Sequence, residues 1–401
     1  MEEKTIKVVK KINIGVHQVY FALTNATKLR HWLCDFSSIS VKIGGRVYLA
    51  WESGYFASGK IVELVQDKKV SYEWRGSNDP ASSLVNFSLE QLKDGTSLLL
   101  EHSRLGNSIE WATTLEEIEK GWSLSLDNLV SMLETGIDLR ISQRPFIGIY
   151  PEEYYRENQS DPIPVESGIR IIDVISGHNA EKVGLKSGDV IVGLNDIQIT
   201  TYPTLTKAIS QFKAGDTIDL TIYREGSKFI QTMQLSHLNL PKVPESPTLL
   251  ADQLREAQAK ILAELSSILA DVTESEADFR PGLEEWSIKE IIAHLIHSER
   301  DHQVWIGNLV LSQEPLVDEF AGNLNARVKA TASLYPNLSD LLSAYKTSIE
   351  ETALCVSLLP LSITSDKGVF WRLAFVGLQL PMHSQSHFDQ ITNNLKLAKN
   401  G

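Results

Sequence analysis

Three histidines in the C-terminal part of the chain have the residue type and spacing of metal ligands. His383 and His387 lie four residues apart, so an α-helix would present both imidazoles on one face, about one turn apart. A third imidazole, from His294 on a facing helix, would complete a three-nitrogen site with at least one open position. Divalent zinc, nickel, iron and manganese all accept such ligands. An open position is what a metal needs to activate water or a thiolate.

Neighbouring residues leave alternatives open. His297 and His302 follow His294 by three and eight residues, and either could point toward the same site. Pro381 precedes His383 by two residues and could distort the helical spacing. The alternative to a metal is a set of histidines that hydrogen-bond to one another between helices.

Further side chains could support such a site. Trp286 is expected to anchor the core rather than to contact a substrate. Asp389 and Gln390 lie close enough in sequence to His383 and His387 to orient them through hydrogen bonds.

The remaining chemistry-bearing residues are sparse. Cys34 and Cys355 are the only cysteines, too few for a disulfide framework or a thiolate-rich metal site. They fit a reducing compartment, and Cys355 is expected to be an inert buried thiol. His31 and His102 stand alone in the sequence and are expected to be structural or solvent-facing. No carboxylate pair or nucleophile–base pair stands out in the first 140 residues.

Composition excludes several classes of protein. The chain has 401 residues, of which 42% are hydrophobic and 22% charged, and it carries a formal charge of −13. These values exclude a disordered, collagen-like or coiled-coil chain. The acidity disfavours general binding to nucleic acid or to anionic membranes. Residues 1–11 are charged throughout, and no apolar run approaches the roughly 20 residues of a membrane span. We therefore expect a cytoplasmic protein.

Three kinds of sequence follow one another. Residues 1–140 show strand-like alternation and end in a helix, residues 141–240 are rich in Gly and β-branched residues, and residues 248–401 are almost entirely helical in pattern. The segment 236–248 contains three prolines and is the clearest linker. No such linker separates the first two segments. The first two domains are therefore expected to be closely coupled and the third more loosely attached.

The first segment predicts a curved sheet and one long helix. The helix is expected over Leu115–Thr135, with Trp122, Leu126 and Val130 on one face. The other predicted elements are strands over Ile6–Ile14, Arg46–Trp51, Ala57–Val65, Lys69–Trp74, Leu84–Gln91 and Thr96–Ser103, and a short helix over His17–Leu23. The stretch Thr27–Leu33 follows that helix.

This segment resembles the START-like SRPBCC superfamily, in the branch related to the heat-shock ATPase activator. The resemblance is carried by Val16 to Trp32, Gly44-Gly45, Gly59, Trp74, Gly95-Thr96, His102, Gly121-Trp122 and Leu133 to Gly136. It implies a helix-grip fold, in which a curved antiparallel sheet wraps around the long helix and often leaves an apolar cavity. The expected small-molecule pocket is lined by Trp51, Trp74, Phe87, Trp122 and Leu126. The alternative is that these side chains simply fill the core.

The second segment is similar to a bacterial-type PDZ domain, a β-sandwich or barrel-like fold. The stretch Gly168 to Ile199, with Ala180, Gly184-Leu185 and Gly188 to Ile191, carries the resemblance. It implies a loop of backbone N–H groups that binds a peptide carboxylate, within Arg144 to Ile149. The expected peptide-binding residues are Phe146, Ile147, Gly148 and Ile149 in the loop and Leu205, Ala208 and Ile209 on the facing helix.

One feature limits this expectation of peptide binding, and one alternative role stays open. The polar segment Pro151–Ser167 reads as an insertion that could cover the groove. The alternative to peptide binding is a PDZ domain that serves as a spacer or a dimer contact.

The third segment predicts a four-helix bundle. The helices are expected over Leu249–Leu269, Ser287–Leu311, Ser339–Leu359 and Gly368–Lys399, the last with a kink at Pro381. Ser287 and Glu290 have the Ser-x-x-Glu spacing of a capping box at the start of the second helix.

Two stretches of this segment resemble the DinB family of four-helix bundles, in its DinB-like second branch. They run from Glu285 to Leu295 and from His383 to Ile391. The resemblance implies that His294, His383 and His387 are the metal ligands. Characterised relatives include metal-dependent transferases and isomerases that use low-molecular-weight thiols, and other members have no known activity.

The sequence thus predicts a multidomain α+β protein with a START-like domain (1–140), a PDZ domain (141–240) and an all-α four-helix bundle (248–401). The expected cofactor is a divalent metal: zinc, nickel, iron or manganese. The expected partners are a protein C-terminus or peptide, a small apolar ligand and a low-molecular-weight thiol, and neither nucleic acid nor membrane. One hypothesis is a metal-dependent thiol transferase-like enzyme. The other is a non-catalytic adaptor or a stress-related ligand- and peptide-binding protein.

Overall fold

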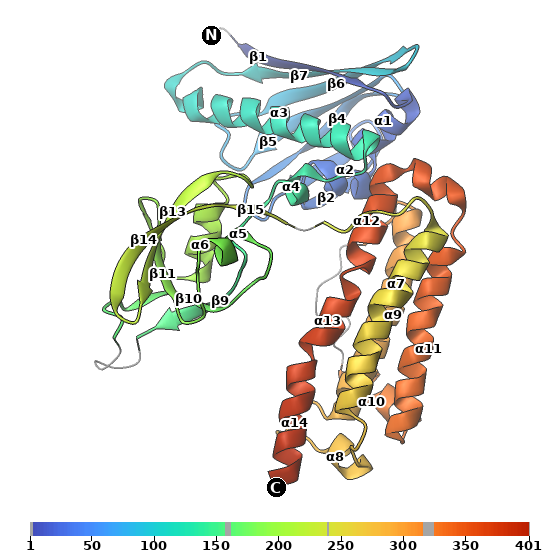
Figure 1. Ribbon diagram of the computed structural model, residues 1–401. Coiled ribbons are helices and arrows are strands. Elements are labelled where there is room, and N and C mark those ends of the chain that lie inside the picture. Colours follow the sequence, from blue (N-terminus) through green and yellow to red (C-terminus); the bar gives the residue numbers. More distant parts are fainter. Residues whose placement is uncertain (1–2, 157–161, 239, 316–324, 401) are drawn as a thin grey trace. The chain divides into compact units, whose positions relative to one another are not determined.

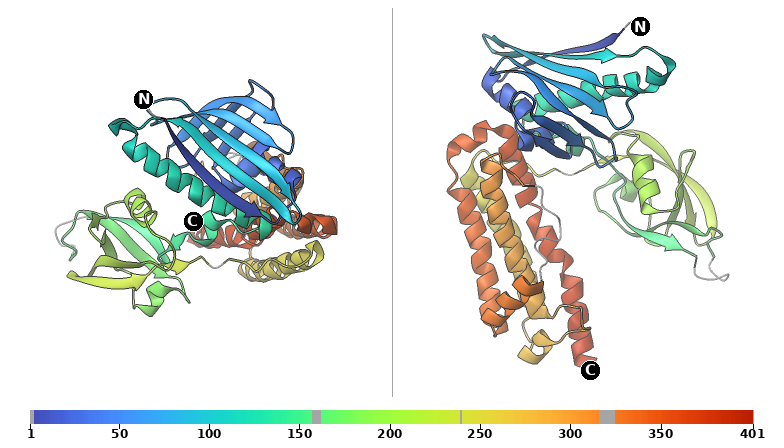
Figure 2. Two further views of the ribbon diagram at one scale, coloured as in Figure 1. Left: turned by 90° about the horizontal axis from the view of Figure 1, so that it is seen from above. Right: turned by 180° about the vertical axis from the view of Figure 1, so that it is seen from behind.

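The computed structural model describes residues 3–156, 162–238, 240–315 and 325–400 (Figures 1 and 2). The chain divides into two compact units: Met1–Asp138 together with Pro241–Gly401, and Leu139–Leu240. The expectation of a loosely attached third segment is therefore wrong, since that segment shares a unit with the first. None of the helices in the described part of the chain combines the length and apolar composition that a bilayer crossing requires.

The first domain is a seven-stranded antiparallel sheet with a long helix across one face (Figures 1 and 2). The strands are ordered β1-β7-β6-β5-β4-β3-β2. They are β1 (Lys4–Ile12), β2 (Phe36–Ile39), β3 (Arg46–Ala50), β4 (Phe56–Val65), β5 (Lys69–Gly76), β6 (Ser83–Leu92) and β7 (Gly95–Leu105). The helices are α1 (Val16–Thr24), α2 (Ala26–Trp32) and α3 (Ala112–Glu134).

The strands and the two helices predicted for this domain are confirmed, whereas α2 and β2 are not predicted from the sequence. Helix α3 buries Ile118, Trp122, Leu126, Leu129 and Met132, which recur at helical spacing, against the inner face of the sheet. Strand β2 has only four residues, two of them serines, so its hydrophobic alternation is too short to be recognised in the sequence.

The second unit is built on a five-strand path ordered β14-β13-β11-β10-β9, with β12 paired to β11. Its helices are α4 (Leu139–Ser142), α5 (Asn179–Lys182) and α6 (Tyr202–Ile209). Its strands are β8 (Pro145–Phe146), β9 (Ile149–Tyr155), β10 (Ser167–Val174), β11 (Val190–Leu194), β12 (Ile197–Gln198), β13 (Thr217–Arg224), β14 (Ser227–Gln234) and β15 (Ser236–His237).

The segment Pro151–Ser167 is not simply a polar insertion. Its first residues, up to Tyr155, belong to β9 and pair with β10. This strand lies at the edge of the sheet and exposes most of its side chains, so its polar sequence does not show strand alternation. Residues 157–161, the middle of the expected insertion, lie outside the described residues.

The third segment is helical. Helices α7 and α9 each pack against α11, and α10 packs against α9. The helices are α7 (Pro247–Ile268), α8 (Glu274–Asp278), α9 (Ile288–Val310), α10 (Asn325–Leu334), α11 (Leu338–Ser357), α12 (Lys367–Gly377), α13 (Leu380–Ser386) and α14 (Phe388–Asn400). The capping box at the start of α9 is confirmed: the Ser287 hydroxyl accepts from the Glu290 N–H, and the Glu290 carboxylate accepts from the Ser287 N–H.

The single helix predicted over Gly368–Lys399 is in fact three helices, α12, α13 and α14. Pro381 has no N–H for the Gly377 carbonyl four residues earlier, and its ring collides with that carbonyl in a continuous helix. Helix α12 accordingly ends at Gly377, and Pro381 lies in the first turn of α13. His387 is the C-cap of α13, so the break before α14 falls at a predicted ligand.

A buried carboxylate joins the first domain to the helical region. Glu314, just after α9, accepts hydrogen bonds from Trp305 Nε1 at 2.6 Å and from Arg372 at 2.8 Å, and lies 3.1 Å from His31 Nε2. Burial lowers the pKa of His31 to about 4, so a neutral His31 donates its N–H. Although burial opposes ionisation, the hydrogen bond from His31 and the charge of Arg372 hold the pKa of Glu314 below its usual range.

Contacts on α12 extend this junction. Lys28 lies 2.5 Å from Asp366, and Lys367 donates to the Glu134 carbonyl at 2.7 Å. These charged contacts explain why the two segments form one compact unit. His31 is therefore structural and buried, and not solvent-facing.

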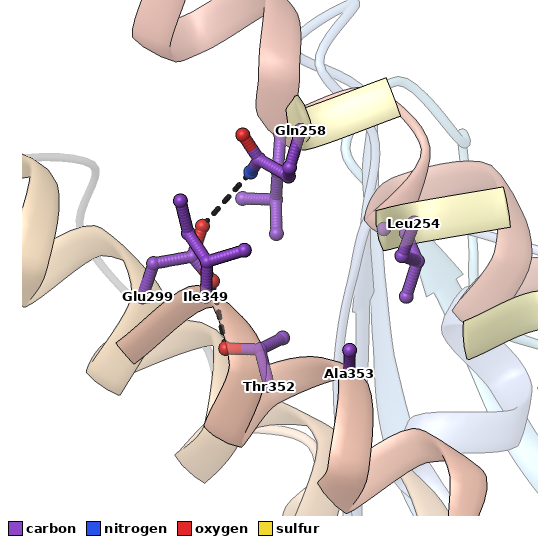
Figure 3. A pocket seen from close by; sticks show the side chains of 8 residues that line it. Leu254, Gln258, Glu299, Ile349, Thr352 and Ala353 are labelled. Carbon is purple, nitrogen blue, oxygen red and sulfur yellow. Dashed lines mark hydrogen bonds between the residues drawn. The ribbon is translucent and has the colours of Figure 1, made fainter. Parts of the chain in front are cut away.

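A second buried carboxylate lies inside the helical region, beside a cavity of about 10 Å³ (Figure 3). Glu299 on α9 is 3% exposed and accepts from Gln258 Nε2 at 3.0 Å. Its other oxygen lies 2.7 Å from the Thr352 hydroxyl, which also lies 3.0 Å from the Ser348 carbonyl. The Thr352 hydroxyl has one hydrogen and can donate it to only one of these two oxygens. When it donates to the Ser348 carbonyl, the contact with Glu299 is satisfied by a protonated Glu299 that donates to Thr352. Burial raises the pKa of Glu299 to about 7.

The parent protein should become less stable as the pH rises and Glu299 ionises, and Glu299→Gln should not show this decrease. The folded pKa of about 7 lies above the ordinary value of 4.5, so the protonated acid favours the folded state. Its contribution is complete below pH 4.5 and is lost as the pH rises toward 7. Because Gln stays uncharged, we expect the variant to exceed the parent by about 1–3 kcal/mol in unfolding free energy at pH 8 and to match it near pH 4.5.

Urea unfolding at both pH values measures this difference. Glu351→Gln, at an exposed position on α11, is the matched control and should keep the pH dependence of the parent. An identical pH dependence in Glu299→Gln and the parent would show that Glu299 is ionised in the folded protein.

Candidate metal centre and binding surfaces

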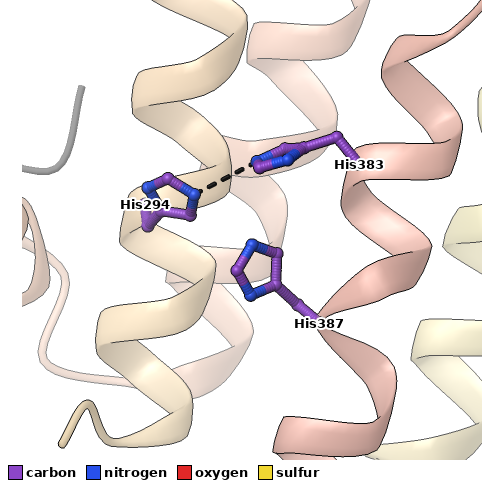
Figure 4. Close-up of side chains that lie close together, drawn as sticks. All are labelled: His294, His383 and His387. Carbon is purple, nitrogen blue, oxygen red and sulfur yellow. Dashed lines mark hydrogen bonds between the residues drawn. The ribbon is translucent and has the colours of Figure 1, made fainter. Parts of the chain in front are cut away.

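The three predicted ligand histidines lie together in the structure (Figure 4). One ring nitrogen from each of His294, His383 and His387 falls within 4.8 Å of the others. His294 projects from the first turns of α9, His383 lies in the middle of α13, and His387 is the C-cap residue of α13. His294 is buried, His387 is intermediate and His383 is exposed, so the cluster opens to solvent on the α13 side.

The spacing fits a shared metal ion. His294 Nε2 and His383 Nε2 are 3.1 Å apart. Two nitrogens of a tetrahedral site with bonds of about 2.0–2.1 Å are separated by about 3.3 Å. Both nitrogens can therefore face one ion with only a small adjustment of the rings.

The hydrogen bond of His387 leaves its Nε2 available to bind a metal ion. Its Nδ1 lies 3.0 Å from the Gln390 side-chain oxygen, which can only accept. Nδ1 therefore carries the proton, and the lone pair is on Nε2, which is buried without a partner among the described residues. Gln390, one of the two residues expected to orient these histidines, therefore contacts His387, and its role at a metal site stays a prediction. Asp389 makes no such contact with these rings in the described part of the chain.

The cluster is uncharged at neutral pH in at least two of its members. Burial, and next the neighbouring His387 and His383, lower the pKa of His294 to about 4. Burial, followed by His387, also lowers the pKa of His383. Neutral imidazoles are the form that binds metals. Trp286 packs against His294 with ring centroids 5.0 Å apart, and its indole N–H donates to Asn325.

The other two histidines of α9 point elsewhere. His297 Nε2 lies 3.0 Å from both the Arg327 carbonyl and the Thr331 hydroxyl. His302 stacks on Trp305. Cys355 is partly buried, and burial raises the pKa of its thiol. These residues do not join the cluster.

The predicted ligand-pocket residues of the first domain lie in one aromatic cluster. The Trp122 ring contacts the Trp74 ring at 5.4 Å and the Phe87 ring at 5.7 Å. Trp51 contacts Trp74 at 6.4 Å, and Leu126 is fully buried. The rings are in direct contact, so they occupy much of the space between α3 and the sheet at this point. The pocket itself stays a prediction.

His102 links the aromatic cluster to the sheet through hydrogen bonds. Trp122 Nε1 donates to His102 Nδ1 at 3.0 Å, so the ring proton is on Nε2, which lies 2.6 Å from the Ser83 hydroxyl. Ser83 in turn donates to the Trp74 carbonyl at 3.2 Å. Burial lowers the pKa of His102 to about 4. His102 is thus a neutral, structural histidine, and not solvent-facing.

The predicted peptide groove has its loop and its helix in one hydrophobic cluster. Ile147, Ile149, Leu205 and Ala208 are buried together, and Ile209 is partly buried against them. Phe146 is partly buried and contacts the His178 ring edge-on at 5.1 Å. Strand β9 lies at the sheet edge, and Glu153 on it accepts from the Tyr202 N–H at the start of α6.

Gly148 is required by the loop geometry. Its φ is +92°, and a Cβ at this position would lie 2.6 Å from the Cβ of His178. Its carbonyl accepts from the Ile175 N–H at 2.9 Å. Only glycine satisfies both constraints without strain.

Comparisons with known proteins identify two of the segments. The profile of the family described as activator of Hsp90 ATPase homolog 1-like protein matches residues 13–134, and that of the PDZ domain matches residues 145–232. Among solved structures, the chain is similar to a protein of Mesorhizobium loti (23% identity, 33% of this chain, 97% of that chain, TM-score 0.31). It is also similar to the Aha1 dimer from Colwellia psychrerythraea (20% identity, 33% and 96%, TM-score 0.30).

Curated relatives match through the PDZ part. The serine protease Do-like HtrA of Lactococcus lactis subsp. cremoris is 28% identical over 152 residues, 36% of each chain. The HtrA of Bacillus subtilis is 31% identical over 102 residues, 23% of each chain. The chain therefore covers only about a quarter to a third of the length of these relatives. The two profiles show a mixed α/β multidomain protein that carries an Hsp90 ATPase activator-like domain and a PDZ domain, domain types that indicate ligand binding and peptide binding.

Proposed function

We propose that the helical region is a DinB-like four-helix bundle that holds one divalent metal ion through His294, His383 and His387. In this proposal the chain has three domains, 1–140, 141–240 and 248–401, and is a metal-dependent enzyme of the thiol transferase kind. The observation that carries it is the convergence of three imidazole nitrogens within 4.8 Å from two helices. Zinc, nickel, iron and manganese are the candidate ions.

The residues around the cluster suit this role. Gln390 fixes the tautomer of His387, the Trp286 ring packs against His294, and the exposed side at His383 admits a small molecule. A metal held by three imidazoles supplies an open position that can bind a thiolate or water and lower its pKa. A low-molecular-weight thiol is the co-substrate that we propose for this position.

The second candidate function is a non-catalytic adaptor or stress-related protein. It is favoured by the two matched domains, which are binding domains, and by the partly buried Cys355, whose raised pKa disfavours a nucleophilic thiolate. In that case the metal would only stabilise the bundle. Metal-dependent consumption of a small thiol by the purified chain separates the two functions.

We further propose a peptide partner for the PDZ domain and an apolar ligand for the first domain. An extended peptide would add to the free edge of β9, with its terminal carboxylate at the loop from Phe146 to Ile149. Its last side chain would contact the partly buried Ile209 of α6. An apolar ligand would lie against α3 and the aromatic cluster around Trp122.

His383→Ala should abolish metal retention. We expect about one divalent ion per parent chain by elemental analysis and close to none in the variant, because two imidazoles hold an ion far less tightly than three. The melting temperature of the parent should fall when the metal is chelated, since an ion that binds only the folded state stabilises it. The melting temperature of the variant should not respond to the chelator.

Gln385→Ala is the matched control, since Gln385 is exposed on the same helix. It should retain the metal content of the parent. Parental metal content in His383→Ala would refute the assignment of the ligands.

The PDZ groove should bind peptides that end in a free apolar residue with a micromolar dissociation constant, about 8 kcal/mol. Amidation of the peptide terminus should remove most of this binding in calorimetry, because the loop N–H groups bind the carboxylate. Gly148→Ala should have a similar effect by distorting the loop.

Gly188→Ala is the control for backbone strain. Gly188 also has a positive φ, of +90°, but nothing lies within 4 Å of an added Cβ and it is remote in sequence from the loop and α6. It should keep peptide binding. Equal affinity for free and amidated peptides would contradict the proposed recognition mode.

A further inference from the structure

The outer face of the first domain carries a hollow of about 670 Å³ over β3, β4 and β5. Its lining includes three cationic side chains, Arg46, Lys60 and Arg75, and one acidic side chain, Glu73. In the described part of the chain, none of these four takes part in an ion pair. The hollow is therefore electropositive, although the whole chain carries −13.

The strand register places two of these cations directly opposite each other and the third one strand away. Arg46 on β3 lies directly opposite Lys60 on β4, and Arg75 on β5 lies opposite Ser58 on β4. Like charges at directly opposed positions of a sheet destabilise it. Glu73, the one acidic side chain of the lining, forms no ion pair with either cation in the described part of the chain. An external anion would therefore relieve the repulsion between Arg46 and Lys60.

Two aromatic side chains extend the same face. Tyr48 and Phe56 are 44% and 40% exposed, with ring centroids 6.0 Å apart. Tyr48 lies opposite Ser58, and Phe56 is two residues before Ser58 on β4, so both rings lie beside the cations. Arg and Tyr are typical of the centres of protein interfaces, where Arg binds carboxylates bidentately.

We propose that this hollow is a docking surface for an acidic polypeptide segment of a partner protein. The charge of the hollow complements carboxylates, and cations on three adjacent strands, about 4.8 Å apart per strand, match carboxylates spaced along an extended chain. The open hollow and the exposed ring pair favour a polypeptide over a small anion, which binds in sites that enclose it. The residues that line this surface are different from those of the metal cluster, of the PDZ groove and of the inner sheet face that α3 covers.

Fluorescence anisotropy with the full chain tests this proposal. The probe is a fluorescein-labelled ten-residue peptide of Asp and Glu with one Phe, amidated so that the PDZ loop cannot bind its terminus. We expect Arg46→Glu combined with Arg75→Glu to weaken binding at least tenfold. Because Arg46→Glu places a carboxylate opposite Lys60, this variant should be as stable as the parent, and circular dichroism checks that it is folded.

The matched control is Lys11→Glu combined with Lys93→Glu, at exposed positions outside the hollow in the same domain. It should bind the peptide as the parent does, and binding to the parent should weaken between 50 and 300 mM salt. Equal weakening in the two double variants would overturn the proposal. Complete displacement of the peptide by millimolar inorganic phosphate, or self-association of the chain through this face in sedimentation, would also overturn it.

Discussion

Three imidazoles that share one small space impose the main constraint on the helical region. Each ring nitrogen must donate a hydrogen bond, accept one or bind a cation. A buried polar atom that does none of these lowers the stability of the fold by about 1–3 kcal/mol. The contact between His294 and His383 satisfies only one nitrogen of each ring, and His294 Nδ1 and His387 Nε2 have no partner among the described residues. A shared cation would supply the partner that His387 lacks and would let His294 and His383 both use their lone pairs.

The helices that carry these rings are positioned by local sequence and by packing. The capping box at Ser287 fixes the start of α9 and hence the position of His294, seven residues on. Pro381 prevents α12 from continuing beyond Gly377 and lies in the first turn of α13. His383 therefore lies on this short helix and His387 at its C-cap. Tyr345 on α11 bonds to Ser384 on that helix at 2.9 Å and ties it to the core. At the other end of α9, Glu314 holds the region against the first domain through Arg372 and His31.

The parts that could be predicted from sequence depend on local pattern. Residues close together in the sequence determine four such features: the histidine spacing, the Ser287 capping box, the apolar face of α3 and the PDZ-like stretch after Gly168. The parts that could not be predicted depend on tertiary contacts. His31 looks isolated until the fold brings Glu314 beside it, and Glu299 looks like any helical glutamate until burial raises its pKa to about 7. Strand β2 and helix α8 are too short for their patterns to be recognised. The sequence predicts only a kink where the last helix is divided, because the position of a break depends on how the neighbouring helices pack.

The coordination shell of the bound metal is the most direct test of the central claim. X-ray absorption spectroscopy on the full chain, loaded with one equivalent of zinc, reports the type and distance of each ligand. The account predicts three imidazole nitrogens at about 2.0–2.1 Å and one further light donor. A sulfur ligand near 2.3 Å, or a shell of oxygen donors without the scattering pattern of imidazole, would contradict it.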